Sequence, residues 1–349
     1  MNAVSPHKIG TRLLAWFDQH GRHDLPWQHP RNAYRVWLSE TMLQQTQVTV
    51  VIPYFQRFVA ALPHLADLAA APLDDVFALW SGLGYYSRAR RLQETALLCM
   101  RDHGGELPRD LDALLALPGI GRSTAGAILS QAYGLPYPIL DGNVRRVLCR
   151  HRDVRGWPGS AATQKNLWRI AERQLPDARI ADYTQALMDL GATVCTSNKP
   201  ACSLCPLHAD CIAFRDGMTD RLPERKLSKA LPEREVYALI ARDRDGRTLL
   251  QRRPPVGVWA SLWSLPEAQS IDDAELWLHR HVLVDAYEML RPIRHTFSHF
   301  RLHIHPLLWR DARAGDAIGD TDGLRWQSTA ALAGIGLPSP IRKLLEGLV

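Results

Sequence analysis

Residues 117–143 read LPGIGRSTAGAILSQAYGLPYPILDGN and carry the clearest structural signal in the chain. Gly119 and Gly121 separate two apolar helical patterns, so the backbone turns sharply there and can approach another molecule closely. The N–H groups that open the second helix lack partners within it and favour an anion. The stretch predicts a helix-hairpin-helix whose glycines contact nucleic-acid phosphate, while a corner that serves packing alone explains the PGIG motif by itself equally well.

The composition is typical of a globular protein with more than one domain. The chain has 349 residues, of which 46% are hydrophobic and 22% charged, and a net charge of +6. This length exceeds what one core usually serves, and the mild basic excess suits a polyanionic partner without requiring one. No apolar run approaches the length of a membrane span, so we expect no membrane contact and a cytoplasmic location.

Apolar residues recur at helical spacing through residues 1–214, where Pro and Gly break the pattern and no convincing strand is found. The expected helices are 9–20, 34–49, 73–80, 88–103, 110–117, 123–133, 143–151, 161–174 and 181–194. A charged, Pro-interrupted segment at 215–234 predicts a linker.

The periodicity changes after the linker. Alternating residues at 236–241 and 248–252, on either side of Asp245-Gly246, predict a β-hairpin, and 302–305 predicts another strand. Helical patterns return at 272–284 and 339–348, so residues 235–349 are expected to form an α+β domain.

Four of the six cysteines form a cluster with the spacing C-x6-C-x2-C-x5-C: Cys195, Cys202, Cys205 and Cys211. Four thiolates in so short a loop can close around one zinc ion or one iron–sulfur cubane, and ligand count does not choose between them. Four neighbouring cysteines without metal are the remaining alternative. A bound metal would serve structure, because the protein fills every ligand position.

Two carboxylates suit acid–base chemistry. Glu40 interrupts the apolar stripe of the helix at 34–49, where low polarity would raise its pKa and keep it protonated as a general acid. Asp141 follows Ile139-Leu140 and precedes a helix, so it is placed as an N-cap whose N–H groups favour the ionised form. A locally satisfied buried Glu and a simple cap are the alternatives. As a pair they fit glycoside cleavage, with one acid on the leaving group and one carboxylate facing an oxocarbenium ion.

The hairpin, Asp141 and the cysteine loop together resemble the endonuclease III superfamily of helix-hairpin-helix DNA glycosylases. Within it, nearly the whole chain is similar to the MutY family of adenine DNA glycosylases. The resemblance rests on LPW at 25–27, VWLSETMLQQTQV at 36–48, GLGYY at 82–86, LPGIGRSTAGAILS at 117–130, ILDGNV at 139–144 and MDLG at 188–191. It implies an all-α helix-hairpin-helix domain over 1–214 with a 4Fe-4S cluster on the four cysteines, followed by a Nudix-like domain at 235–349.

The resemblance also implies a reaction. Adenine opposite 8-oxoguanine or guanine in double-stranded DNA would be flipped into a pocket, with Glu40 protonating the base. Asp141 would stabilise the sugar cation, by its charge or by a transient covalent bond, and Asn143 and Ser123 would orient Asp141, the sugar or the water. Trp27 and Gln185 are implied to line the adenine pocket. Gln45, Leu83 and Tyr85 are the implied wedge residues, which fill or open the base stack. We expect a monomer.

One position separates two enzyme types. Bifunctional relatives of the endonuclease III type carry a lysine just after the hairpin, whose amine attacks the sugar and leads to strand cleavage. This chain has Ser123 there, and guanidinium groups such as Arg145 cannot replace the amine. A monofunctional, water-using glycosylase is indicated. The alternatives are a glycosylase/lyase for oxidised pyrimidines and a non-catalytic DNA-binding scaffold, which would need neither Glu40 nor Asp141.

The second domain resembles the Nudix fold at PPVGVWASLW, residues 254–263. Residues 267–283 lack the acidic cluster that holds the metal of a Nudix hydrolase, so nucleotide hydrolysis is not expected. In the similar glycosylases this domain reads 8-oxoguanine through a loop that corresponds to 294–300, and Phe297, Ser298 and His299 are the implied contacts.

Overall fold

The computed structural model describes residues 6–226, 230–283, 286–314 and 323–348. Contacts divide the chain into two compact units, Met1–Ala70 with Arg91–Ser228 and Ala71–Arg90 with Lys229–Val349. Residues 71–90 therefore pack with the second unit, although they lie inside the sequence range expected for the first domain. Among the described residues, no helix is long and apolar enough to cross a membrane.

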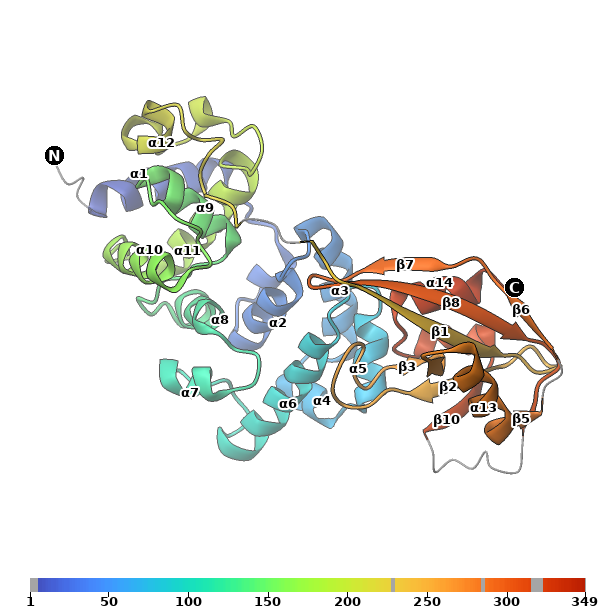
Figure 1. Cartoon of the computed structure of the whole chain (residues 1–349). Coiled ribbons are helices and arrows are strands. Elements are labelled where there is room, and N and C mark those ends of the chain that lie inside the picture. The colour runs from blue at the N-terminus through green and yellow to red at the C-terminus, as the bar shows by residue number, and fades with distance from the viewer. Residues whose placement is uncertain (1–5, 227–229, 284–285, 315–322, 349) are drawn as a thin grey trace. The chain divides into compact units, whose positions relative to one another are not determined.

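The first unit is helical, as predicted, and the part of it that the structure describes contains no strand (Figure 1). Its elements are α1 (Pro6–His20), η1 (Pro26–Gln28), α2 (Ala33–Leu43), α3 (Val48–Ala61), α4 (Leu65–Ala70), most of α6 (Ser87–Asp102), α7 (Leu111–Ala116), α8 (Arg122–Ala127), η2 (Ile128–Ala132), α9 (Gly142–His151), α10 (Ala161–Arg173), α11 (Ile180–Asp189), η3 (Leu190–Val194), η4 (Cys202–Leu204), η5 (His208–Asp210) and α12 (Ile212–Arg215).

Two details of this unit differ from the sequence prediction. The helix expected at 34–49 is broken, because α2 ends at Leu43 and Gln45 takes a left-handed backbone with φ of 60° before α3 begins. The helices α3 and α4 were not predicted beyond residue 49. Both continue the apolar packing, since Val51, Phe55 and Leu68 are buried.

The second unit contains α5 (Leu73–Trp80) and a mixed α+β body, as the sequence predicts for 235–349. Its elements are β1 (Glu233–Ala241), β2 (Thr248–Arg252), β3 (Trp263–Ser264), β4 (Glu267–Ala268), α13 (Ile271–His281), β5 (Val282–Leu283), β6 (Tyr287–Met289), β7 (Ile293–Thr296), β8 (Arg301–Trp309), β9 (Arg313–Ala314), β10 (Leu324–Gln327), η6 (Thr329–Gly334) and α14 (Ser339–Glu346).

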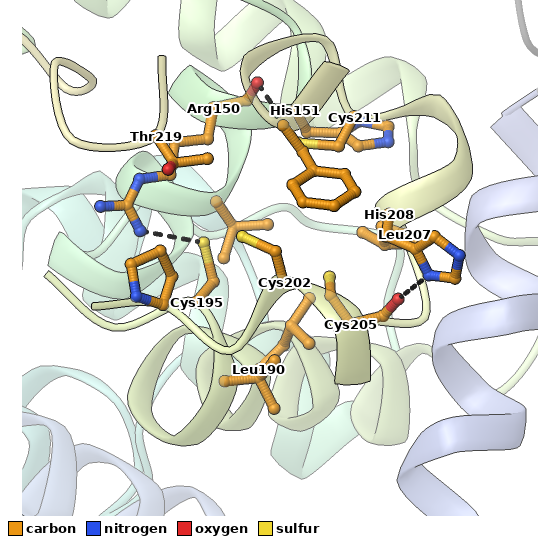
Figure 2. Close-up of a pocket in the computed structure, with 14 residues that line it drawn as sticks. Arg150, His151, Leu190, Cys195, Cys202, Cys205, Leu207, His208, Cys211 and Thr219 are labelled. Carbon is orange, nitrogen blue, oxygen red and sulfur yellow. Dashed lines mark hydrogen bonds between the residues drawn. The ribbon is translucent and has the colours of Figure 1, made fainter. Parts of the chain in front are cut away.

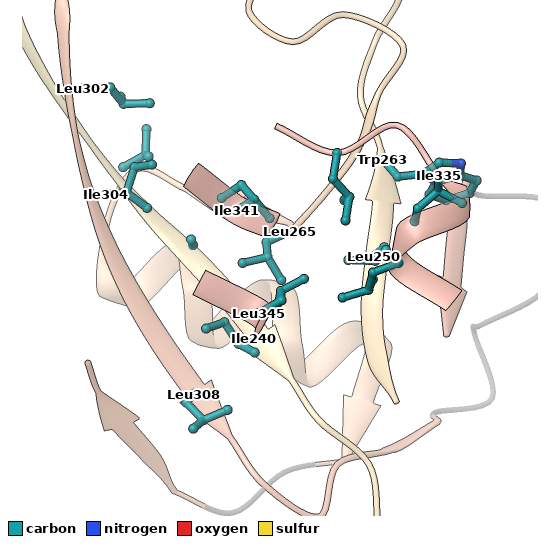
Figure 3. Packing of buried hydrophobic residues seen from close by; sticks show 14 of the residues in the cluster. Ile240, Leu250, Trp263, Leu265, Leu302, Ile304, Leu308, Ile335, Ile341 and Leu345 are labelled. Carbon is teal, nitrogen blue, oxygen red and sulfur yellow. The ribbon is translucent and has the colours of Figure 1, made fainter. Parts of the chain in front are cut away.

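The predicted hairpin between 236–241 and 248–252 is wrong. Strand β1 pairs in parallel with β8, from Glu233 opposite Arg301 to Ala241 opposite Trp309, in a sheet with the order β4-β1-β8-β6 to which β7 adds on β8. Strand β2 lies in a second sheet with the order β10-β2-β3 and shares only an isolated bridge with the end of β1. Apolar side chains of both sheets, η6 and α14 form one core, in which Ile240, Leu250 and Leu345 lie (Figure 3).

Candidate active site and cysteine pocket

Asp141 caps α9, as its place in the sequence predicts. Its Oδ1 accepts a hydrogen bond from the N–H of Val144 at 2.7 Å, and its Oδ2 accepts one from Nδ2 of Asn143 at 3.3 Å. Ser123 Oγ accepts from the N–H of Leu140 at 3.0 Å, which ties the segment before Asp141 to α8. Burial raises the pKa of Asp141, while the N–H groups of α9 and the charges of Arg145 and Arg146 oppose that shift.

Glu40 lies on α2, which packs against α8 and η2. Burial raises the pKa of the Glu40 carboxyl to about 8, and the negative charge of Asp141 adds to the shift. Glu40 is therefore mostly protonated at neutral pH. The two predicted carboxylates share one electrostatic environment, although 101 positions of sequence separate residue 40 from residue 141.

Arg146 connects Asp141 with the cysteine loop, a link that the sequence analysis missed. Its Nη2 donates to Asn143 Oδ1 at 2.8 Å and to the Gly191 carbonyl at 2.7 Å, and its Nε donates to the Cys195 carbonyl at 2.7 Å. Gly191 permits this approach, because a Cβ there would lie 2.5 Å from Asn143 Cβ. The MDLG motif thus serves close packing against α9.

Two buried glutamines each keep one side-chain atom without a hydrogen-bond partner in the described part of the chain. Gln185 donates from Nε2 to Asp189 at 2.8 Å, while its Oε1 has no partner. Asp189 forms an ion pair with Arg22, with 2.6 Å between Asp189 Oδ1 and Arg22 Nη2. Nε2 of Gln28, next to Trp27 in η1, also lacks a partner. These two buried atoms are available to hydrogen-bond a ligand or water. Trp27 and Gln185 were predicted from the sequence as site residues, whereas Gln28 and Arg22 were not, and Asp189 entered only as part of the MDLG motif.

The hairpin glycines differ in conformation. Gly119 has a φ of 80°, and a Cβ there would lie 3.1 Å from the side chain of Arg91, so the turn requires glycine. Gly121 has an ordinary φ of −93° as the residue before α8, and nothing lies within 4 Å of its missing Cβ. Its backbone is open to another molecule.

The three wedge candidates also differ. Gln45 is exposed in the break between α2 and α3. In the second unit, the side chain of Tyr85 is 53% exposed with a left-handed φ of 48°, whereas Leu83 is buried. Tyr85 is therefore presented to solvent, and Leu83 supports the turn from within.

The four clustered cysteines line one pocket, with Arg150, Leu190 and Leu207 among its other walls. Figure 2 shows the sulfurs of Cys195, Cys202 and Cys205 turned toward the same space. Arg150, which is buried, donates from Nη1 to Cys195 Sγ at 3.4 Å and to the Thr196 carbonyl at 2.6 Å. Burial raises the pKa of Cys205 to about 12 and also raises those of Cys202 and Cys211. Among the described residues, no three His, Cys, Asp or Glu side chains are grouped for a single metal ion.

The residues Phe297, Ser298 and His299 form a turn after β7. Phe297 stacks on Phe300 with ring centroids 4.5 Å apart and also contacts Trp259 and His295 at 5.4 and 4.6 Å. Ser298 and His299 are exposed, and Ser298 Oγ lies 3.4 Å from His299 Nδ1. The packed rings around Phe297 therefore support the exposed polar side chains of Ser298 and His299.

Comparisons with known proteins cover both parts of the chain. The family model of the HhH-GPD superfamily base excision DNA repair proteins matches residues 38–173, and that of the NUDIX domain matches 236–347. An adenine DNA glycosylase of Buchnera aphidicola is 37% identical over 96% of this chain and 95% of its own length, and one of Mus musculus is 35% identical over 96% and 77%. The chain belongs to the adenine DNA glycosylase family.

Solved structures support the same fold for the helical part. A thermostable thymine-DNA glycosylase is 27% identical, with a TM-score of 0.53 over 60% of this chain and 97% of that chain. Endonuclease III in a non-covalent complex with DNA is 24% identical, with a TM-score of 0.51 over 62% and 99%. Membership of the adenine DNA glycosylase family confirms the resemblance, the two-part fold and the assignment as a DNA repair glycosylase, which makes DNA a partner. The endonuclease III-like alternative is not favoured.

Proposed function

We propose that the chain hydrolyses the N-glycosidic bond of adenine that is mispaired with 8-oxoguanine or guanine in double-stranded DNA. The observation that carries this proposal is the electrostatic coupling of Glu40 and Asp141, because burial and the charge of Asp141 raise the pKa of Glu40 to about 8, while Asp141 itself caps α9. Two carboxyl groups with different environments can divide the roles of proton donor and cation stabiliser. We take adenine as the released base from the names of the relatives, and the acid-assisted bond cleavage from the two carboxylates.

The reaction begins when adenine leaves the base stack, because the glycosidic bond is out of reach inside a duplex. Protonated Glu40 donates its proton to the departing base. Ionised Asp141 faces the positive charge that develops on the sugar, and Asn143 keeps the Asp141 carboxylate in place through its Nδ2. Water then completes the hydrolysis, directly or after a transient bond between the sugar and Asp141.

The unpartnered glutamine atoms suit the base. Adenine carries an exocyclic amine that donates hydrogen bonds and ring nitrogens that accept them. Gln185 Oε1 is a free acceptor for the amine, and Gln28 Nε2 is a free donor for a ring nitrogen. Trp27 lies beside Gln28 and supplies an aromatic wall.

We expect no strand cleavage by this enzyme. Ser123 occupies the position of the lysine in bifunctional relatives, and its hydroxyl is engaged with the backbone N–H of Leu140. A hydroxyl cannot form the Schiff base that precedes β-elimination. The backbone at Gly119 and Gly121 contacts phosphate, Gln45 and Tyr85 enter the base stack, and Leu83 supports the turn that presents Tyr85.

The cysteine pocket fits a 4Fe-4S cluster. Four soft thiolates are the donor set that such a cluster takes, and Arg150 supplies positive charge and a hydrogen bond beside Cys195. All four thiols line this one pocket, and the resemblance to the endonuclease III superfamily favours a cluster over zinc. When bound, the cluster would supply rigidity to the loop that Arg146 joins to Asn143.

Iron and sulfide analysis tests the cluster. Anaerobically purified protein should contain about four iron and four acid-labile sulfide atoms per chain, the content of one cubane. Stoichiometric zinc without sulfide would refute the cluster and leave a zinc loop in its place.

The turn at 297–299 reads the base opposite adenine, since exposed Ser298 and His299 can bond the added oxygen or N–H of 8-oxoguanine. We further propose that the enzyme acts as a monomer in the cytoplasm, on nucleoid DNA. Analysis of products from duplexes with adenine opposite 8-oxoguanine, guanine or thymine tests the function. Free adenine and alkali-dependent nicks are expected for the first two duplexes. Nicks without alkali, or release of an oxidised pyrimidine instead, would refute it.

A further inference from the structure

Residues 71–90 belong to the glycosylase part by sequence and to the second unit by contacts. They lie within residues 38–173, which match the HhH-GPD family model, yet they pack with residues 229–349. The segment consists of α5, the turn of residues 82–86 and the start of α6. Tyr85, the exposed wedge candidate, is thus in the same compact unit as the turn at 297–299.

Helix α5 is fixed to this unit at two places. Asp74 forms an ion pair with Arg252 of β2 at 2.9 Å and lies 3.4 Å from Nε1 of Trp263. Gly336, after η6, packs so closely that an added Cβ would lie 2.7 Å from Cβ of Phe77. The helix therefore has little freedom to shift against the β-sheets.

A second set of contacts holds the ends of the turn. Arg342 of α14 donates from Nη2 to Ser81 Oγ at 3.0 Å and from Nη1 to the Leu332 carbonyl at 2.7 Å. The buried hydroxyl of Tyr86 donates to the Leu337 carbonyl at 3.0 Å and lies 3.3 Å from Ser81 Oγ. Ser81 and Tyr86 thus bracket the turn, and both are joined to residues 337–342.

Three residues of the turn have a positive φ, and Tyr85, which is not a glycine, needs such support. Gly82, Gly84 and Tyr85 have φ values of 105°, 71° and 48°. A left-handed backbone is uncommon for a bulky aromatic residue and persists only where its surroundings fix it. Arg88 adds one restraint from within, because its Nη2 donates to the carbonyls of Leu83 and Gly84 at 3.2 Å.

We propose that Ser81, Tyr86 and Arg342 are positioning residues that set where Tyr85 enters the base stack, so that the unit that reads the opposite base also directs the extrusion of adenine. This inference rests on the proposed function. An aromatic wedge lowers the cost of unstacking a base only when it is held at the right step of the duplex. The contacts act through Tyr85 and leave Glu40 and Asp141 untouched.

The first test compares two substrates that differ in the cost of extrusion. One duplex pairs adenine with 8-oxoguanine, and the other carries adenine as an unpaired single-nucleotide bulge, which leaves the stack more easily. Ser81→Ala and Tyr86→Phe should slow single-turnover adenine release from the paired duplex by about five- to twentyfold, the effect of one or two lost hydrogen bonds. Release from the bulge should change by less than about twofold, since little extrusion energy is needed there.

Matched variants complete this test. Arg342→Ala should behave as Ser81→Ala does, Arg342→Lys should recover part of the rate, and Lys343→Ala, an exposed cation on the same helix, should match the unaltered chain. Equal slowing on both duplexes would show a general loss of structure and overturn the proposal. Unchanged rates on both would overturn it as well.

The second test needs no activity. The N–H of Leu83 donates to the Trp80 carbonyl at 3.1 Å within the turn. In the full chain without DNA, Ser81→Ala should speed hydrogen exchange of residues 82–86 and leave that of α9 unchanged. Unaltered exchange in 82–86 would overturn the positioning role, whatever the rates. If the unaltered chain releases no adenine from any duplex, the proposed function fails instead, and exchange still decides whether these residues hold the turn.

Discussion

The carboxylate region and the turn at 297–299 hold their polar groups in opposite ways. The Asp141 carboxylate accepts hydrogen bonds from the Val144 N–H and from Asn143 Nδ2, and Asn143 links it to Arg146 and the cysteine loop. Ser298 and His299 are exposed, and Ser298 Oγ lies 3.4 Å from His299 Nδ1. The carboxylate of Asp141 is already hydrogen-bonded within the protein, whereas the exposed side chains of Ser298 and His299 are available to hydrogen-bond DNA.

The contrast reflects the two tasks. Charges that stabilise a transition state are worth most where water is largely excluded and no reorganisation is needed, and Glu40 and Asp141 are both partly buried. A reader gains selectivity when its hydrogen bonds are made with one ligand and lost with another. We therefore expect changes in the first region to lower the rate on every substrate, and changes in the second to alter the ratio between substrates.

The largest effect is expected at the carboxylates. Glu40→Gln should lower the single-turnover rate of adenine release by about 100- to 10,000-fold, the usual contribution of a general acid. Asp141→Asn removes the charge that faces the sugar cation and should abolish release. Binding of the duplex should persist, because the hairpin and the second unit are unaltered. A Glu40→Gln enzyme that releases adenine at a near-normal rate would remove Glu40 from the mechanism.

A smaller and selective effect is expected at the turn. Replacing Ser298 and His299 with Ala should narrow the preference for 8-oxoguanine over guanine by roughly one to two powers of ten, equivalent to about two hydrogen bonds. The rate with guanine should change little. Thr296→Ala is the matched control, since it removes an exposed hydroxyl two residues away. Equal slowing on both duplexes would make the turn a general DNA contact.

The pH dependence of adenine release should report on the carboxylate region, through the titration of Glu40. The pKa of Glu40 is raised to about 8, and its protonated form is the one that donates, so adenine release should fall as pH rises through this value. The loss approaches about tenfold for each further pH unit, because only the protonated fraction reacts. The residual rate of Glu40→Gln should lack this decline. A profile that stays flat to pH 10 would show that another group delivers the proton.

The sequence predicted most helices because their apolar stripes and Pro or Gly breaks are local features. It missed the break at Gln45, since no glycine or proline marks that left-handed residue. It also failed for the hairpin after the linker. Alternation identified β1 and β2 as strands, but β1 pairs with β4 and with β8, the latter 68 residues further along in register, and periodicity carries no information on pairing.

In the candidate site, too, features set by neighbouring residues were predicted and features set by distant contacts were not. Asp141 was predicted as a cap because the residues that decide this are adjacent to it. Arg146, Gln28 and Asp189 were not predicted as site residues. Arg146 bonds the Cys195 carbonyl, Asp189 pairs with Arg22, and Gln28 has a buried Nε2 without a hydrogen-bond partner, and none of this can be read from neighbouring residues. Local spacing identifies residues that act on their neighbours. Residues that join distant segments appear only in three dimensions.

The membership of α5 in the second unit has a consequence for how the chain is made. During synthesis residues 71–90 leave the ribosome long before residues 229–349, so the second unit cannot close until nearly the whole chain has emerged. Until then Phe77, buried in the finished protein, lacks the cover that Gly336 provides. A chain that stops before residue 229 would keep every clustered cysteine and both carboxylates and still expose this apolar helix, so we expect it to self-associate during folding.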